Sequence, residues 1–294
     1  METNQYTPEK QEYSFNGIIQ IDDSEFRLIS ALVYEKFGIN LTDKKKALVR
    51  GRLNKLIRGL GFTSFHQYYD SILEDKTGRS LLDLVDKIST NHSYFFRENE
   101  HFDFLETVVL PKIEQQLKSE NSNDIRLWCA GCAAGEEPYT LAMVLLEHFG
   151  ASFFYGRPGV LATDISLSAL SQAAEGVYTP DRVQAVPHYY KSKYFTQTAD
   201  GLFKIKNDLK KLILFKRLNL MRPDFPFKGK FHVIFCRNVM IYFDGTTKMD
   251  LVSKFHKVLF DDGYLFIGHS ESLGRGSGLF QYIQPAVYSK INGV

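Results

Sequence analysis

The stretch Leu127-Trp-Cys-Ala-Gly131-Cys-Ala-Ala-Gly135-Glu-Glu-Pro-Tyr139 decides the fold class of this chain. An apolar run over 125–129 favours a buried strand, and small residues then form a turn. A helix with one apolar face follows, on the spacing of Leu141, Val144, Leu145 and Phe149. A strand, a glycine-containing turn and a helix in this order predict the opening unit of an α/β ligand-binding domain.

Two carboxylates, Glu136 and Glu137, stand where this helix begins. Acidic side chains disfavour a phosphate there and suit a ligand that carries hydroxyl or ammonium donors. The other interpretation is that both residues only complement the helix dipole, and the pattern leaves the two open. Gly131 and Gly135 are expected to let the backbone turn sharply and come close to a ligand.

The composition excludes several classes of protein. With 294 residues and a net charge of +2, the chain as a whole is not a polyanion binder, so we expect no nucleic-acid partner. No apolar run approaches the length of a membrane span and no signal-peptide pattern is present, so we expect a cytoplasmic protein without membrane insertion. Cys129-x-x-Cys132 has the spacing of a redox or zinc pair, but no second Cys/His pair lies nearby, which favours packing and no metal.

The patterning divides the chain into four segments. Residues 1–20 are polar and aperiodic and predict a flexible tail. Residues 21–90 predict a small helical domain, with helices after Asp22 and over 43–60, 64–74 and 80–89. Residues 91–124 form a connecting turn, a helix over 99–118 and a linker. Residues 125–294 alternate strands and helices and form the α/β domain.

Within the α/β domain the spacing predicts a parallel sheet with right-handed crossovers. The expected strands are 125–130, 159–164, 231–236 and 263–269, and the expected helices are 137–149, 166–175 and 246–260. A last edge strand is expected over 281–291. Between 178 and 220 short strands at 203–207 and 212–218, with a turn at 199–201, predict an inserted β subdomain.

Ligands of open parallel sheets bind at the carboxyl ends of the strands, which selects further candidates. Asp164 follows the second strand, where it can accept hydrogen bonds from ribose hydroxyls or cap the next helix. Asn238 and Tyr242 follow the third strand. His269 follows the fourth, where an acid–base role and a structural role are both open.

The absence of several common motifs narrows the range of ligand classes. The chain has no Gly-x-x-x-x-Gly-Lys-Ser/Thr loop and no Gly-x-Ser-x-Gly elbow, which argues against an NTPase and a serine hydrolase. The first glycine loop is not Gly-x-Gly-x-x-Gly, which weakens a nicotinamide interpretation. Acidic residues after the first two strands instead suit an adenosyl ligand with an ammonium group, such as S-adenosylmethionine.

The helix over 43–60 is strongly basic. Its cations are Lys44, Lys45, Lys46, Arg50, Arg52, Lys55 and Arg58, and no acidic residue lies between Lys44 and Gly61. Such a run is either a solvated face or a docking face for an acidic partner, and the pattern alone leaves both open.

Six motifs occur in one order along the chain. They are Asn91-x-Ser93-x-x-Phe96-Arg97-Glu98, Gly135-Glu-Glu-Pro-Tyr139, Ala162-Thr-Asp164-Ile, Asn219-Leu220, Phe235-Cys-Arg-Asn-Val-Met-Ile-Tyr-Phe243 and Gly268-His-Ser-Glu271. With them the chain resembles the CheR family of chemotaxis receptor methyltransferases over residues 22–290. The resemblance implies a class I, Rossmann-like S-adenosylmethionine-dependent methyltransferase domain with a small inserted β subdomain, preceded by a small all-helical domain.

The resemblance also implies the reaction and its residues. A methyl group passes from S-adenosylmethionine to glutamate carboxylates of methyl-accepting chemoreceptors, which leaves S-adenosylhomocysteine and a methyl ester. A carboxylate with an ordinary pKa of about 4.3 is already ionised at neutral pH, so no general base is needed. Arg97 and Tyr242 are expected to position the substrate. The implied cofactor contacts are Asn91, Ser93 (where threonine is common), Arg97, Glu137, Asp164, Asn219, Leu220, Asn238 and Val239.

The implied partner is the cytoplasmic domain of a chemoreceptor, docked on Lys45, Lys46, Arg50, Arg52 and Lys55. Some family members bind a pentapeptide at the receptor's C-terminus through a glycine-rich loop of the β subdomain. The corresponding loop here, 196–201, is short and has one glycine, so we expect no dependence on that peptide. We also expect a monomer. Two alternatives stay open: a methyltransferase for another protein or a small molecule, and a non-catalytic module that binds receptor or nucleotide.

Overall fold

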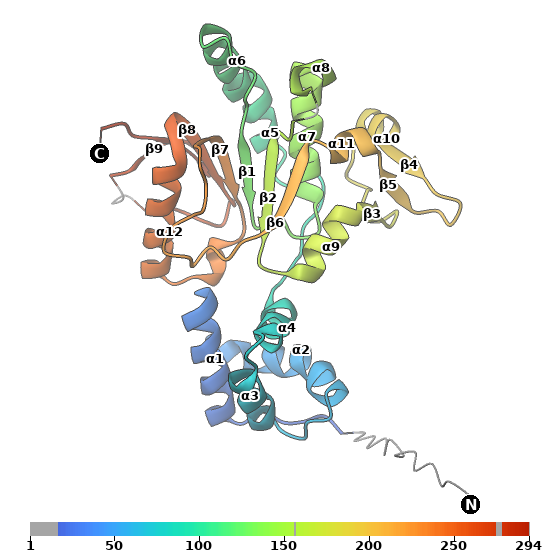
Figure 1. Ribbon diagram of the computed structural model, residues 1–294, viewed down its shortest axis with the longest axis vertical. Helices are drawn as coiled ribbons and strands as arrows, with labels where there is room; N and C mark the ends of the chain where they lie inside the picture. The colour runs from blue at the N-terminus through green and yellow to red at the C-terminus, as the bar shows by residue number, and fades with distance from the viewer. Residues whose placement is uncertain (1–16, 156, 275–277, 294) are drawn as a thin grey trace, which may run out of the picture. The chain divides into compact units, whose positions relative to one another are not determined.

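The computed structural model describes residues 17–155, 157–274 and 278–293, which divide into two compact units (Figure 1). The smaller unit comprises the chain up to Leu32 and Leu41–Ile88, and the larger comprises Val33–Asn40 and the chain from Ser89 onward. Most of the tail predicted over 1–20 lies outside the described residues. Among the helices described, none combines the length and the apolar character needed to cross a membrane.

The smaller unit is helical, as predicted. Its helices are α1 (Asp23–Phe37, whose last turn counts with the larger unit), α2 (Lys46–Gly59), α3 (Phe65–Glu74) and α4 (Arg79–Ile88). A 3₁₀ turn at Asp43–Lys45 precedes α2. Apolar residues recur every three or four positions in these helices, so each buries one face. The core residues include Ile29, Leu53, Ile57, Phe65, Tyr68, Leu84 and Val85.

One buried amide fastens the segment before α1 to α2. The side chain of Asn54 donates to the carbonyl of Ile19 at 2.7 Å and accepts from its N–H at 3.2 Å. Both backbone groups of this extended residue are therefore satisfied away from water, which a purely apolar side chain could not achieve.

The larger unit is built on a mixed seven-stranded sheet with the order β6-β2-β1-β7-β8-β10-β9 (Figure 1). The strands are β1 (Leu127–Ala130), β2 (Val160–Asp164), β6 (Ile213–Arg217), β7 (Phe231–Cys236), β8 (Leu259–Ile267), β9 (Phe280–Gln284) and β10 (Val287–Lys290). The first five in spatial order are parallel, and the four predicted parallel strands are confirmed.

The prediction of a single edge strand over 281–291 is wrong. Two antiparallel strands occupy this segment, with β10 paired to β8 and β9 to β10. The chain reverses at Pro285 and Ala286, where Ala286 has φ +60°. Proline lacks an N–H for the ladder, so the run could not continue as one central strand.

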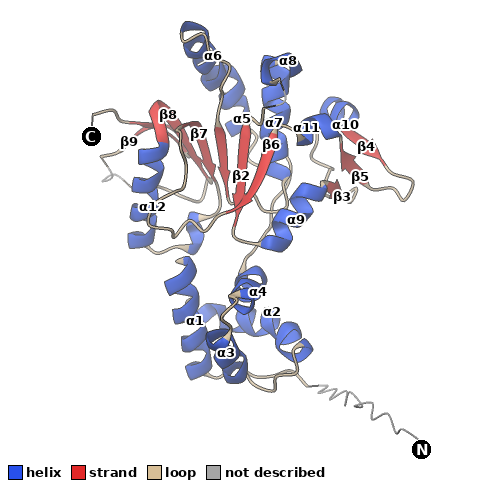
Figure 2. Ribbon diagram, viewed as in Figure 1, coloured by secondary structure: helices blue, strands red, loops and turns tan. Residues whose placement is uncertain are grey.

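Helices pack on both faces of the sheet (Figure 2). One core combines α6 (Leu110–Ser119) and α7 (Glu136–Phe149) with strand residues such as Val160 and Val233. The helix α9 (Leu167–Glu175) adds Leu170 to that core. The second core packs α12 (Gly245–Val258) against Trp128 and the apolar residues of β7 and β8.

The helix predicted over 99–118 is interrupted. It comprises α5 (Glu100–Phe104), a π-helical turn at Leu105–Val109 and α6. Pro111 explains the irregularity, because its ring crowds the carbonyl four residues earlier and its nitrogen cannot donate to it. A π turn just before the proline relieves both problems.

The inserted β subdomain has three short strands in the order β3-β5-β4. They are β3 (Val177–Tyr178), β4 (Phe195–Gln197) and β5 (Phe203–Ile205), with α10 (His188–Tyr194) and α11 (Asn207–Lys210) beside them. The turn predicted at 199–201 joins β4 to β5. The strand predicted at 212–218 forms as β6 but belongs to the large sheet, where it pairs with β2 from Ile213↔Val160 to Arg217↔Asp164. The short helix α8 (Ala151–Phe154) was not predicted.

Gly131 tests how tightly the first loop is packed. Its φ is +95°, and a Cβ there would lie 2.3 Å from Cγ2 of Val239. We expect Gly131→Ala to lower the free energy of unfolding by about 2 kcal/mol or more, from backbone strain plus overpacking. Urea denaturation measures this. Gly245→Ala is the matched control, because no atom lies within 4 Å of its Cβ position; equal losses in both variants would contradict the packing argument.

Candidate active site

The site is framed by backbone that few residues tolerate. Eight described non-glycine residues have positive φ, and four of them lie in three loops that meet here: Phe96 (56°), Glu98 (54°), Ala133 (47°) and Asn238 (58°). Such residues cost about 1–3 kcal/mol each and gather at functional sites. The Phe96 N–H donates to Oγ1 of Thr140 at 3.3 Å, which ties the first of these loops to α7.

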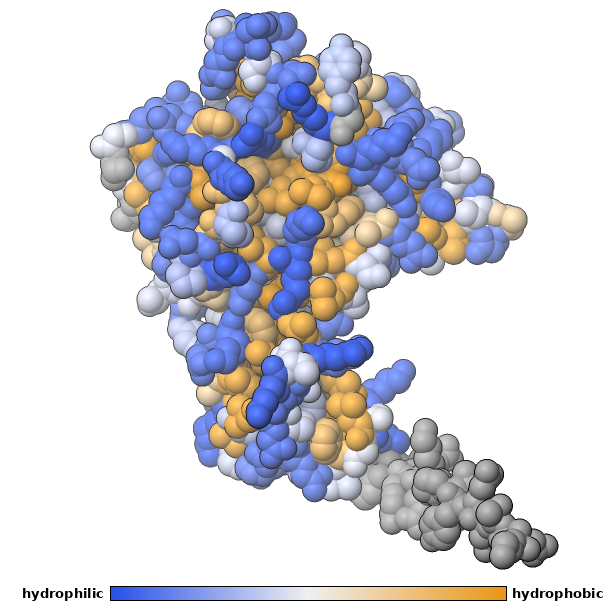
Figure 3. All heavy atoms as spheres, in the orientation of Figure 1, coloured by the Kyte–Doolittle hydropathy of each residue, from blue (hydrophilic) through white to orange (hydrophobic). Residues whose placement is uncertain are grey.

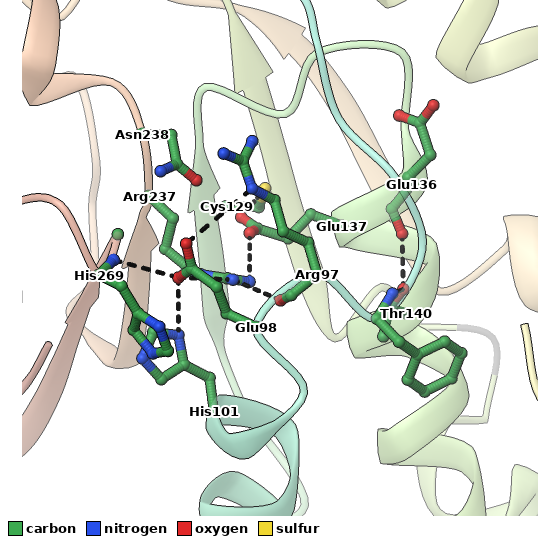
Figure 4. A network of polar contacts seen from close by, with 12 residues as sticks. Arg97, Glu98, His101, Cys129, Glu136, Glu137, Thr140, Arg237, Asn238 and His269 are labelled. Carbon is green, nitrogen blue, oxygen red and sulfur yellow. Dashed lines mark hydrogen bonds and ion pairs between the residues drawn. The ribbon is translucent and has the colours of Figure 1, made fainter. Parts of the chain in front are cut away.

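A buried guanidinium joins the loops (Figure 4). Arg237, at the end of β7, has a side chain with 0% exposure. It lies 3.0 Å from Oε2 of Glu98 and 2.9 Å from Oε2 of Glu137, and it also donates to the carbonyl of Arg97. The sequence motif contained Arg237, but no role was predicted for it. One cation therefore fixes both the turn that carries Arg97 and the start of α7.

The two carboxylates on Arg237 differ in their pKa. Burial alone would raise the pKa of Glu98, but Arg237 and neighbouring histidines outweigh it and the pKa is lowered. At Glu137 burial dominates over Arg237, and the pKa is raised. Oε1 of Glu137 accepts from the thiol of Cys129 at 3.1 Å. Glu98 is thus the permanent anion of the pair, and Glu137 is the carboxylate that a cationic ligand would favour in its charged form.

Glu136 and the cysteines do not join this cluster. The Glu136 carboxylate is fully buried, forms an ion pair with Arg182 and points away from Arg97 and Glu137 (Figure 4). Burial raises the pKa of Cys129 and Cys132 well above its usual range, which opposes thiolate chemistry at this pair. Gly135, with φ +100°, is required by the hydroxyl of Tyr178, 2.8 Å from its Cβ position.

Asp164 ends β2 as predicted and organises the neighbouring loop. Its Oδ2 accepts from the N–H of Ala133 and its Oδ1 from the N–H of Ser166, both at 2.9 Å. The amide of Asn91 donates to Oγ of Ser166 at 3.3 Å, which brings the segment that holds half-buried Ser93 to this strand end. Ser166, not Asp164, caps α9, because its Oγ accepts from Ala169. Carboxylate oxygens have further lone pairs, so Asp164 can still accept from a ligand.

Glu271 holds the ends of β7 and β8 together, a role that was not predicted. Its carboxylate accepts from the N–H groups of Gly268 at 2.6 Å, Asn238 at 2.9 Å and Ile241 at 3.0 Å. Asn238 and Val239 are therefore fixed through their backbone, and their side chains stay half-buried. The half-buried Tyr242 accepts at its carbonyl from Asn40 at 2.8 Å.

Asn219 and Leu220 lie in the irregular segment between β6 and β7. The amide of Asn219 donates to the carbonyl of Lys36 at 2.7 Å and accepts from Met221 at 3.0 Å. The carbonyl of Leu220 accepts from Nζ of Lys254 at 2.9 Å. These contacts anchor the segment to the last turn of α1 and to α12.

Two histidines lie beside Glu98. The rings of His101 and His269 are 4.8 Å apart, edge to face, and ligand atoms of Glu98, His101 and His269 lie within 4.8 Å of one another. Burial and nearby Arg237 lower the pKa of His101 to about 4, so it is neutral at physiological pH. Oε2 of Glu98 already accepts hydrogen bonds from Arg237 and from the N–H of His269, the latter at 3.2 Å. These two donors would compete with a cation for that oxygen.

The polar groups of the site fit S-adenosylmethionine. Glu137, in the first turn of the helix that follows β1, and Asp164, at the end of the neighbouring strand β2, offer acceptor oxygens, which suit an ammonium group and ribose hydroxyls. A partly exposed cation is supplied by Arg97. Its side chain is 25% exposed, and its Nη1 donates to the carbonyl of His92 at 3.1 Å.

The basic residues predicted for docking lie in the smaller unit, and several stabilise it. Lys46 forms an ion pair with Asp23, Arg50 donates to Gln20 at 2.7 Å, and Arg52 donates to the carbonyl of Ile88. Lys45 is half-buried, whereas Lys44, Lys55 and Arg58 are exposed.

The strand order and the carboxylates at the strand ends define the class as a class I, Rossmann-like S-adenosylmethionine-dependent methyltransferase. The comparisons agree. The model described as "CheR methyltransferase, SAM binding domain" matches residues 91–288, and that described as "CheR methyltransferase, all-alpha domain" matches residues 24–89.

Curated relatives match nearly the whole chain. The chemotaxis protein methyltransferase of Borreliella burgdorferi is 48% identical over 277 residues, covering 94% of this chain and 97% of the relative. That of Escherichia coli is 33% identical over 274 residues, covering 92% of each. A probable chemotaxis protein methyltransferase of Rhizobium etli is 35% identical, covering 87% of this chain and 96% of the relative. The chain therefore belongs to the CheR methyltransferase family.

The raised pKa of Glu137 leads to a prediction about the pH dependence of ligand binding. If the ammonium group of S-adenosylhomocysteine contacts ionised Glu137, protonation of Glu137 competes with binding. Because burial raises this pKa above the ordinary 4.5, affinity should fall with decreasing pH from a higher pH than for an exposed glutamate. Glu137→Gln should bind about 10–100-fold more weakly and without this pH dependence. Calorimetry across pH measures both; exposed Glu175→Gln is the control, and unchanged affinity in Glu137→Gln would contradict the assignment.

Proposed function

We propose that the chain transfers a methyl group from S-adenosylmethionine to glutamate carboxylates of chemoreceptors and forms glutamate methyl esters in chemotaxis adaptation. The observation that carries the proposal is the placement of Arg97. Its guanidinium is partly exposed, while its own carbonyl is held by buried Arg237 beside Glu137. A planar guanidinium can bind a carboxylate through two parallel hydrogen bonds.

S-adenosylmethionine, when bound, supplies a methyl group activated by a sulfonium, which an ionised carboxylate can displace without a general base. The chain's contribution is then positioning, worth several kcal/mol when reacting groups are held in near-attack geometry. Arg97 would orient the acceptor carboxylate and Tyr242 would support it. A guanidinium bound too tightly would weaken the nucleophile, so the contact of Arg97 with the His92 carbonyl, which shares its donors, is consistent with an orienting role.

The remaining predicted contacts divide by chemistry. Glu137 would accept from the ammonium group and Asp164 from the ribose hydroxyls. Asn91, Ser93, Asn219, Leu220, Asn238 and Val239 would complete the contacts. Asn219 uses its amide within the chain, so its contribution would come from position and backbone.

We also propose a cytoplasmic monomer that engages the receptor through the basic residues of the smaller unit. The β4–β5 connection supports independence from a receptor C-terminal peptide. Its backbone closes on itself, with Thr198 N–H donating to the Leu202 carbonyl at 2.8 Å and the Thr198 hydroxyl to Asp200 at 2.5 Å. Binding of a receptor C-terminal peptide to the full chain would overturn this part.

The function is tested by incubating the protein with labelled S-adenosylmethionine and receptor membranes. We expect alkali-labile label on the receptor, because methyl esters hydrolyse in base. Arg97→Ala should lower the rate of ester formation about 100-fold through misplaced acceptor, and Arg97→Lys should retain part of it. Alkali-stable label would indicate another acceptor chemistry. A chain that binds neither S-adenosylmethionine nor its product by calorimetry would be a non-catalytic module.

The docking role is tested on cations that do not support the fold. Reversal of exposed Lys44, Lys55 and Arg58 to glutamate should slow receptor methylation about tenfold at low salt and less at high salt, because screening weakens surface charge interactions. Affinity for S-adenosylhomocysteine should not change. The control reverses exposed Lys76, Arg79 and Lys87 in the same unit. Equal rates for both triple variants would rule out a specific basic face.

A further inference from the structure

One face of the large sheet is left open over β2 and β6. The helices that contact these strands most, α7 and α9, belong to the face that carries Val160 and Ile213. On the opposite face the chain crosses from β6 to β7 through residues 218–230, which are irregular throughout (Figure 2). The β1–β2 and β7–β8 crossovers contain α7 and α12 instead. Parallel sheets normally carry helices on both faces, so this crossover leaves a place where a helix is expected.

The open face forms a groove with an apolar floor. A cavity of about 510 Å³ is lined there by Leu161, Leu214, Leu218, Phe227 and Phe231. Leu214, in the middle of edge strand β6, is 43% exposed. Figure 3 shows apolar side chains gathered over β2 and β6 with hydrophilic ones around them. An apolar surface rimmed by polar groups marks an interaction site more often than a chance exposure.

The rim of the groove is positive. Arg126, Lys216, Arg217 and Lys228 line it, and Asp124 is the one carboxylate among the lining residues. Asp124 pairs with Arg126 at 2.5 Å, so the excess charge comes from the other three. The whole chain carries only +2, so this is a local concentration of charge. A ligand that complements the groove has an apolar centre and acidic flanks.

We propose that the groove over β2 and β6, defined by Leu161, Leu214, Phe227, Lys216 and Lys228, docks an amphipathic α-helix of a protein partner. The helix would fill the layer that the 218–230 crossover leaves open, place its apolar stripe on Leu161 and Leu214, and set acidic side chains against Lys216, Arg217 and Lys228. Helices that lie in grooves use apolar anchors at i, i+3, i+4 and i+7, which form one apolar stripe that can lie on this floor. The proposal does not depend on the substrate of the methyltransferase site.

The test uses the full chain and a labelled 18-residue helix-forming peptide with a leucine stripe and glutamate flanks. Fluorescence anisotropy should show saturable binding that weakens with salt, and a peptide with lysine in place of glutamate should bind at least about tenfold more weakly. Leu214→Glu should weaken binding at least about tenfold by removing a buried apolar contact and adding repulsion. Lys216→Glu with Lys228→Glu should do the same without touching the floor. Ile283→Glu is the matched control, since Ile283 is 39% exposed on β9, the strand at the other edge of the sheet.

Five results would overturn the proposal. No saturable binding of the glutamate peptide would do so, as would equal binding of both peptides or equal effects of Leu214→Glu and Ile283→Glu. Saturation by oleate that depends on Leu214, without peptide binding, would show a site for a small amphiphilic anion instead. Dimerisation that Leu214→Glu abolishes would show that a second copy of the chain covers the groove. Each variant is first checked for an unchanged unfolding transition and unchanged affinity for S-adenosylhomocysteine, so that loss of fold is recognised.

Discussion

The arrangement of the site depends on the buried guanidinium of Arg237. A charged group with no exposure is costly unless it is paired and fully hydrogen-bonded, and removal of one partner from such a pair typically costs about 3–5 kcal/mol. At Arg237 both terminal nitrogens have partners, in Glu98, Glu137 and the carbonyl of Arg97, whereas Nε has no hydrogen-bond partner among the described residues. These partners come from the loop before α5 and from the start of α7, and Arg237 itself follows β7, so one interaction sets the relative positions of three loops. The strained backbone at Phe96 and Glu98 is tolerable because this pairing over-determines it.

The same pairing also sets the electrostatics of the site. One cation is paired with two carboxylates whose environments shift their pKa in opposite directions. The pKa of Glu98 is lowered, and burial raises the pKa of Glu137. A ligand with an ammonium group would supply the positive charge that Glu137 lacks, so the proposed cofactor and the buried pair are complementary. Glu271 performs the corresponding mechanical task on the far side, since its three backbone contacts hold the ends of β7 and β8 in register. Arg237 and Glu271 can therefore both shape the site without contacting a ligand.

The sequence predicted the fold class because hydrophobic periodicity records it directly. The run before Gly131 and the run from Phe231 to Cys236 favoured buried strands, and the spacing over residues 21–90 favoured helices. Prediction failed where a partner far along the chain decides the outcome. Strand β6 looks like part of a β hairpin until its pairing with β2 is known, and the pairing of Arg237 with Glu98 spans 139 residues. Likewise the sequence predicted Arg50 and Arg52 as docking residues but could not predict their contacts with Gln20 and the Ile88 carbonyl, which stabilise the smaller unit.

The proposed chemistry explains why positioning dominates this molecule. A glutamate carboxylate is ionised at neutral pH on every protein surface, so the reactivity of the nucleophile cannot select the substrate. Selection must come from where the acceptor is held, which places the demand on Arg97 and on surfaces outside the site. The structure meets the first demand by fixing the backbone of Arg97 through Arg237 while leaving a quarter of its side chain exposed. We propose that separate surfaces meet the second: exposed cations on the helical unit and a basic, apolar groove on the open face of the sheet. A partner that engages either surface would be selected by where it binds rather than by the reactivity of its carboxylates, which is the form of specificity this reaction leaves available.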